Sequence, residues 1–149
     1  MLLRQPAAYA VRALVWLARQ PKNSRWLATE VAQREGIPHP YLSKVLGTLK
    51  SQGIVSSTRG PHGGYVLTRA PESISLLLIT ELFDSERRMN VCILAYGQCG
   101  ECNRCPLGDF WSGTRASIRV YLQTTTIDAL ARYRSPDNPA VEDSPDIHE

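Results

Sequence analysis

The stretch that decides the fold is residues 54–68, IVSSTRGPHGGYVLT. Residues 54–59 and 65–68 form short runs rich in β-branched residues, which favour extended strands. Between the runs lies GPHGG, a glycine and proline cluster that is able to reverse the chain. The sequence therefore predicts a β-hairpin with a glycine-rich tip.

Three helices are predicted ahead of the hairpin. Residues 7–18 are good helix formers with apolar side chains at helical spacing. A short helix is expected over residues 28–35, ended by Gly36, and a third is expected to open at Pro40 and run to about residue 52. Three helices followed by a hairpin is the order of a winged helix-turn-helix, so the predicted fold class is mainly α with a small β-hairpin wing.

The rest of the chain predicts further helices around a segment that contains the cysteines. Helices are expected over residues 74–83 and 106–123, the second of them long and amphipathic, with an irregular segment between them. Thr126 is expected to cap a last short helix through residue 133.

These patterns divide the chain into three parts. Residues 1–70 make up the predicted winged helix-turn-helix domain, and residues 71–134 contain the cysteines and the later helices. Residues 135–149 carry three prolines, five acidic residues and no basic one, so a disordered acidic tail is expected there.

Charge is segregated along the chain in the same way. Residues 1–70 hold ten lysines and arginines against two glutamates, a net charge of +8. Residues 71–149 hold seven basic and twelve acidic groups, a net charge of −5. A small, strongly basic module is typical of a protein that binds phosphates, although a solvated basic surface kept for solubility is the alternative.

The predicted third helix has the features of a recognition helix, which must enter a groove about 12 Å wide. Its expected buried stripe is Tyr41, Leu42, Val45, Leu46 and Leu49. Polar residues face outward, as they also would on an ordinary amphipathic helix. Together with the hairpin tip, they give the predicted DNA-binding set: Pro40, Tyr41, Ser43, Lys44, Lys50, Arg59, Gly60, His62, Gly63 and Gly64.

Three of these stretches resemble the IscR/NsrR family of bacterial regulators: YAVRAL at residues 9–14, the apolar pattern that begins at Tyr41, and RGPHGGY at residues 59–65. The order of the elements agrees over residues 1–130. The resemblance implies a homodimeric winged-helix repressor or activator on a palindromic promoter site. Many relatives carry an acidic residue near the start of the recognition helix, where this chain has Ser43 and Lys44, so promoter preference is not transferred.

The long helix over residues 106–123 is the pairing element that the resemblance implies. Its wide aromatic stripe independently predicts a partner. The residues of this predicted pairing surface are Leu107, Phe110, Trp111, Thr114, Ile118, Tyr121 and Leu122.

All four cysteines fall within fourteen residues, as Cys92-x6-Cys99-x2-Cys102-x2-Cys105. The start of the chain lacks the pattern of a signal peptide, and clustered cysteines in such a chain favour a metal or redox site over disulfides. Thiolates hold both iron–sulfur clusters and zinc. Structural zinc, a thiol or disulfide switch without metal, and inert cysteines are the alternatives to a cluster.

The family resemblance implies an iron–sulfur cluster, because its sensing members place three cysteines in this loop. These match Cys92, Cys99 and Cys105, and we predict Cys102 as the fourth ligand with Asp109 in reserve. The C-x2-C-x2-C run favours a [4Fe-4S] over a [2Fe-2S] cluster. The predicted function is a regulator whose promoter binding is controlled by this cluster in response to redox state, nitric oxide or iron.

Other function classes have less support in the sequence. It has no glycine-rich phosphate loop, nucleophile elbow or paired His/Glu motif, so no enzyme and no catalytic residue is expected. A redox or electron-transfer metalloprotein would have no use for a +8 module, and a DNA binder without sensing is a further alternative. No apolar run approaches the roughly 20 residues that span a bilayer, so a cytoplasmic protein is expected.

Overall fold

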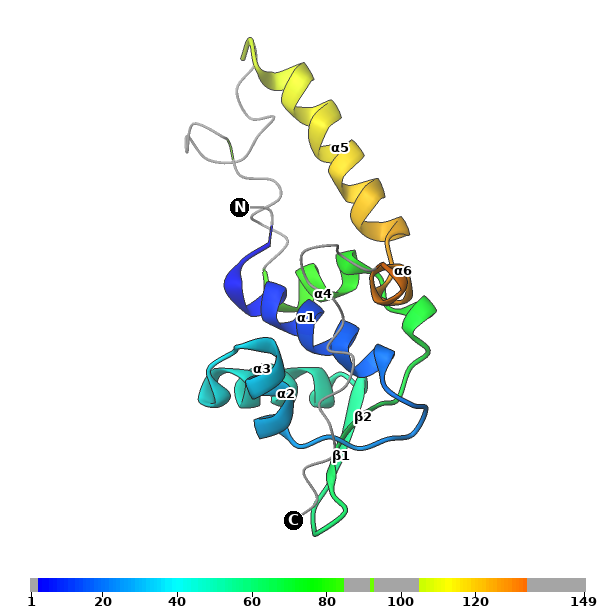
Figure 1. Cartoon of the computed structure of the whole chain (residues 1–149). Helices are drawn as coiled ribbons and strands as arrows, with labels where there is room; N and C mark the ends of the chain where they lie inside the picture. The colour runs from blue at the N-terminus through cyan, green and yellow to red at the C-terminus, as the bar shows by residue number, and fades with distance from the viewer. Residues whose placement is uncertain (1–2, 85–91, 93–104, 134–149) are drawn as a thin grey trace.

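The computed structural model describes residues 3–84, 92 and 105–133. It confirms the predicted fold class, a mostly helical chain with one antiparallel hairpin (Figure 1). The elements in chain order are α1 (Gln5–Arg19), α2 (Ala28–Glu35), α3 (His39–Ser51), β1 (Val55–Thr58), β2 (Gly64–Leu67), the 3-10 turn η1 (Pro71–Ser73), α4 (Leu76–Phe83), α5 (Gly108–Thr124) and α6 (Ile127–Arg132).

Helix α1 lies at the centre of the molecule, and one hydrophobic core surrounds it. Leu14 of α1, Leu46 of α3, Ile79 of α4 and Ile127 of α6 are all fully buried in this core. Burying one such side chain contributes about 1.5–3 kcal/mol relative to its exposure to water. The winged-helix elements and the helices that follow them therefore share a single core.

Helix α3 begins at His39, one residue before the predicted start, because a proline in the first turn loses no helical hydrogen bond. Leu42 and Leu46 are buried as predicted. Tyr41 was wrongly placed in the buried stripe, since its side chain is exposed. Its ring instead meets that of Tyr9 on α1 edge to face, with the centroids 5.4 Å apart.

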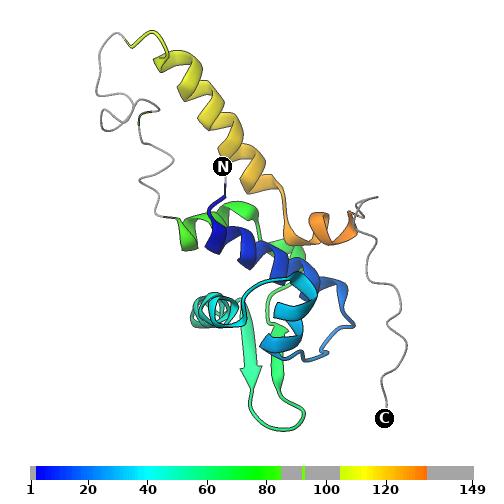
Figure 2. The ribbon, with the colours of Figure 1, turned by 60° about the vertical axis from the view of Figure 1, so that its left-hand side comes forward.

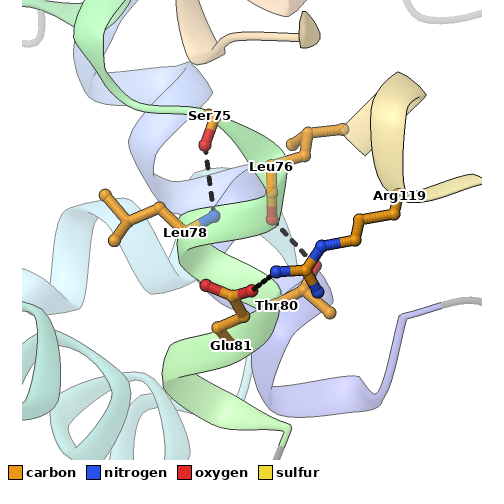
Figure 3. A network of polar contacts seen from close by, with 6 residues as sticks. All are labelled: Ser75, Leu76, Leu78, Thr80, Glu81 and Arg119. Carbon is orange, nitrogen blue, oxygen red and sulfur yellow. Dashed lines mark hydrogen bonds and ion pairs between the residues drawn. The ribbon is translucent and has the colours of Figure 1, made fainter. Parts of the chain in front are cut away.

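Helix α4 starts at Leu76 rather than at the predicted residue 74. Ser75 is the cap: its Oγ accepts a hydrogen bond from the backbone N–H of Leu78 at 3.2 Å (Figure 3). Ser75 also pairs with Thr126 in an antiparallel bridge, which keeps this stretch extended. Thr126 caps α6 as predicted, because its Oγ1 accepts from the N–H of Ala129.

The wing is a hairpin in which Val55 pairs with Leu67 and Thr58 pairs with Gly64. A third segment, at Trp26, pairs with the edge of β2 that does not face β1. The N–H of Trp26 donates to the carbonyl of Tyr65 at 3.0 Å, and the N–H of Tyr65 donates to the carbonyl of Trp26 at 2.7 Å. The sequence does not predict a strand pairing for Trp26, because one bridge of this kind leaves no periodic pattern.

Helix α5 leads away from the rest of the molecule, as two views of the ribbon show (Figures 1 and 2). Its 17 residues span about 25 Å. Leu122, near its C-terminal end, is the one buried residue among them. No helix in the described part of the chain has the length and hydropathy needed to cross a bilayer.

The wing yields a stability prediction with a matched control. A Cβ at Gly64 would lie 2.7 Å from the backbone of Trp26, and the φ of Gly64 is +135°. We expect Gly64→Ala to lower the free energy of unfolding by about 2–4 kcal/mol. Gly47→Ala, at a helical glycine with open space around it, should raise it by about 0.5–1 kcal/mol. Urea unfolding followed by circular dichroism measures both, and equal midpoints for the two variants would refute this reading of Gly64.

Candidate nucleic-acid interface and cysteine segment

The outward side of α3 is polar and lies opposite its buried stripe. Lys44, Gly47 and Lys50 are exposed, and Ser43 is half-buried. The Oγ of Ser43 lies 3.3 Å from Nε2 of His39, one turn earlier. Small and basic side chains on this face would let the helix lie in a major groove and reach base edges.

Lys50 connects the recognition helix to the wing. Its Nζ donates a hydrogen bond to the Oγ of Ser57 on β1 at 2.7 Å. At the tip of the wing, Arg59, Gly60 and His62 are exposed. The structure thus places α3 and the wing side by side with positive charge between them and at the tip, as binding to phosphates requires.

Two of the glycines predicted to contact DNA, Gly63 and Gly64, are required by the geometry of the hairpin itself. A Cβ at Gly63 would lie 2.3 Å from the carbonyl oxygen of Thr58, and the N–H of Gly63 closes the turn onto the carbonyl of Gly60. Gly64 is buried against the backbone of Trp26. Both glycines are therefore needed to form the wing, and their contact with DNA stays a prediction.

The segment that carries the family resemblance in α1 positions α2 and α3. The guanidinium of Arg12 pairs with the carboxylate of Glu35 at 3.2 Å and donates to the carbonyl of the same residue. It also lies over the ring of Tyr9, 5.8 Å from the centroid, and Tyr9 in turn contacts Tyr41. These contacts hold the end of α2 and the start of α3 against α1.

Sequence reasoning missed Arg25, a further cation on the wing. Its guanidinium donates to the Oγ1 of Thr58 at 2.6 Å. Arg25 lies between the predicted helices at residues 7–18 and 28–35, in a stretch with no periodicity, so the sequence offered no sign that it would lie against β1.

The structure describes two of the four cysteines. Cys92 and Cys105 are half-buried free thiols, whereas Cys99 and Cys102 lie outside the described residues. Asp109, the predicted reserve ligand, is exposed in the first turn of α5. Among the described residues, no three His, Cys, Asp or Glu side chains gather closely enough to hold a metal ion.

The two ends of the cysteine segment, residues 84–105, make hydrogen bonds to residues at the N-terminal ends of α1 and α5. At its start, the buried carboxylate of Asp84 accepts a hydrogen bond from the backbone N–H of Arg4 at 3.3 Å, and Nε of Arg4 lies 3.7 Å from its other oxygen. At its end, the carbonyl of Cys105 accepts from the N–H of Gly108, the first residue of α5. The segment therefore joins the α1–α4 unit directly to α5.

The predicted pairing surface of α5 divides into two sides. Leu107, Phe110 and Tyr121 are exposed, with Phe110 75% exposed. Ile118 is half-buried and packs against the core, and Leu122 is buried in the core of its own chain, so it offers little surface to a partner. The half-buried residues of this set are Trp111, Thr114 and Ile118.

A three-helix unit with an antiparallel wing and a basic outer face defines the class of winged-helix DNA-binding regulators. Within that class the chain belongs to the Rrf2 family, whose model, described as an iron-dependent transcriptional regulator, matches residues 3–133. Its relatives are transcriptional regulators, and this is a regulatory rather than an enzymatic family.

Three known proteins illustrate the similarity. The regulator IscR of Cereibacter sphaeroides is 32% identical over 147 residues, covering 95% of this chain and 94% of its own. The structure of T. potens IscR matches with a TM-score of 0.67 at 22% identity, over 91% of this chain and 93% of that one. Staphylococcus aureus CymR in its oxidized form matches with a TM-score of 0.70 at 25% identity, over 91% and 99%.

The outer face of α3 yields a prediction for DNA binding. We expect Lys44→Ala to weaken binding to a duplex selected from a random pool by the wild-type protein, by roughly 5- to 100-fold, because a base-edge contact is lost. Arg132→Ala, which removes the same charge from an exposed side chain at the end of α6, should leave the affinity within about twofold. Fluorescence anisotropy at fixed salt measures both dissociation constants. Equal losses in the two variants would show that only net charge matters.

Proposed function

We propose that this protein is a homodimeric transcriptional repressor that binds a palindromic promoter site and is controlled by an iron–sulfur cluster. Residues 1–70 read the DNA, and residues 71–134 sense and pair. Cys92, Cys99, Cys102 and Cys105 hold the cluster, which responds to redox state, nitric oxide or iron. The observation that carries the proposal is the cysteine segment, anchored between the DNA-reading unit and the projecting helix α5.

The exposed side of α5 supports the homodimer. Phe110 and Tyr121 present large apolar rings to solvent on a helix that leads away from the body (Figure 2). Isolated chains rarely expose such a stripe, and a second copy related by a two-fold axis would cover both copies at once. The same axis would present two recognition helices to half-sites one helical turn, about 34 Å, apart.

The described donors fit an iron–sulfur cluster. Cys92 and Cys105 are free and partly accessible, as thiolate ligands must be. When bound, the cluster would supply a link among the thiolates that is lost or altered on oxidation, nitrosylation or iron shortage. The similarity to IscR proteins, one of them 32% identical over nearly the whole chain, supports this choice over structural zinc.

The chain has the contacts needed to carry a change in this segment to the DNA-reading unit. Arg119 of α5 pairs with Glu81 of α4 at 3.0 Å, so the two helices are held together near the middle of α5 (Figure 3). The cysteine segment joins the C-terminal end of α4, close to Glu81, to the N-terminal end of α5. A change in the spacing of its thiols would therefore tilt α5 against α4 and alter the separation of the paired recognition helices.

A thiol switch without metal is the second candidate. The match to CymR in an oxidized form and the presence of two free, partly accessible thiols favour it over the remaining alternatives. In that case the cysteines would form a disulfide on oxidation, and α5 would move for the same mechanical reason.

Anaerobic purification separates these options. We expect visible absorption bands and equal amounts of iron and acid-labile sulfide, and we expect Cys92→Ser to lose both because a ligand is missing. Asp109→Asn should retain the cluster, since Cys102 supplies the fourth thiolate. A colourless protein containing zinc would establish a structural site instead, and a colourless protein without metal would favour the thiol switch.

The homodimer is tested on α5. We expect Phe110→Glu to shift the mass measured by light scattering from that of two chains to that of one, because a charge would be buried in the interface. Ala116→Glu, at an exposed position about 120° around the helix from Phe110, should leave the dimer intact. A dimer that survives Phe110→Glu would place the pairing surface elsewhere.

A further inference from the structure

The wing carries a cation on each of its two faces. Side chains alternate along a strand, so Val55, Ser57 and Tyr65 share the face that packs against the core. Lys50 bonds to Ser57 on this inner face. Thr58, one residue further, points to the outer face, where Arg25 bonds to it. The hairpin is thus held between a lysine on the side of α3 and an arginine on the side away from it.

Arg25 reaches its position across the middle strand of the wing. Its neighbour Trp26 pairs with Tyr65 of β2, and β2 pairs with β1, so β2 lies between Arg25 and Thr58. The residue of β2 opposite Thr58 is Gly64, whose missing side chain leaves the route over the sheet open. The guanidinium is thereby fixed on the outer face.

An open cleft adjoins this guanidinium. Asn23, Arg25, Leu27 and Glu30 line one side of it, and residues 60–63 of the wing tip line the other. The carboxylate of Glu30 is engaged in capping α2, because its Oε2 accepts from the N–H of Leu27 at 2.7 Å. Arg25 and Glu30 are the charged residues of this lining, so Arg25 supplies its positive charge for an approaching phosphate.

We propose that this cleft, through Arg25, binds the DNA backbone strand on the side of the wing away from α3. A minor groove is about 6 Å wide and has a phosphate strand on each side. A wing inserted there presents Lys50 to one strand and Arg25 to the other, with Arg59 at the tip. This inference rests on the proposed DNA-binding function and adds a second phosphate contact to it.

The bond to Thr58 makes Arg25 a prearranged contact. An exposed arginine loses rotamer freedom when it binds phosphate, and the hydrogen bond at 2.6 Å already restricts it. Arg25 keeps further N–H donors for phosphate oxygens after this bond is made, since a guanidinium has five.

The test uses the full chain and a duplex selected from a random pool by the wild-type protein. We expect Arg25→Ala to weaken binding by roughly 10-fold and to lower the slope of log affinity against log salt by about 1.8, which is 0.9 for each of two phosphates in a dimer. In an ethylation-interference experiment, Arg25→Ala should abolish interference at phosphates of one strand beside the wing. Lys50→Ala should abolish it at phosphates of the other strand.

Two matched variants distinguish a direct phosphate contact by Arg25 from a structural role of its bond to Thr58. Thr58→Val removes the bond to Arg25 but keeps the cation, and should cost no more than about threefold with the slope unchanged. Glu30→Gln keeps an acceptor for the cap and removes the negative charge, and should strengthen binding by about two- to fivefold. Arg25→Ala with an unchanged slope, or Thr58→Val with the full loss, would overturn the inference. Steep salt dependence of the wild type tests the DNA-binding function itself, so the two failures are distinguishable.

Discussion

The backbone of residues 74–76 hydrogen-bonds to that of residues 125–127, and this pairing holds the start of α4 beside the junction of α5 and α6. The N–H of Leu76 donates to the carbonyl of Thr125, and the N–H of Ile127 donates to the carbonyl of Ile74, both at 2.9 Å. The guanidinium of Arg19, the last residue of α1, also donates hydrogen bonds to the carbonyls of Ala131 and Tyr133 at the end of α6. Helix α5 is thereby fixed at its C-terminal end, while its N-terminal end continues into the cysteine segment.

Helix α5 is therefore held in the shared core at its C-terminal end only. Leu122 is buried at the fixed end, and Phe110 is exposed near the other. The ion pair of Arg119 with Glu81 lies between these two points and limits how far the helix can tilt from α4. In the proposed dimer, a change in the cysteine segment at the N-terminal end of α5 would be passed along this helix to both DNA-reading units, whatever chemistry its thiols use.

Much of the fold follows from local pattern. The apolar repeats of α1 and α3, the glycine that ends α2 and the threonine that caps α6 are each read within a few residues, and the structure has them as predicted apart from Tyr41, which is exposed. The wing was predicted from β-branched runs around a glycine cluster. The start of α4 was misplaced because Ser75 is held extended by Thr126, fifty-one residues away, and local pattern carries no sign of such a partner.

The same distinction applies to the candidate site. The polar face of α3 and the wing tip could be predicted, whereas the position of Arg25 depends on the bridge between Trp26 and Tyr65. Tyr41 was assigned to the core by spacing alone, but its side chain is exposed and meets the ring of Tyr9 edge to face. The amphipathic stripe of α5 did not reveal that Leu122 lies in its own core, because periodicity does not distinguish an internal partner from a second chain.

We propose above all that the cysteine segment controls DNA binding through α5. This proposal is tested most directly by measuring, under anaerobic conditions, the affinity of one preparation for its selected duplex before and after the cluster is removed. We expect the affinity to change by at least about 10-fold, which corresponds to a coupling free energy of about 1.4 kcal/mol. Equal affinities of the loaded and unloaded protein would contradict it.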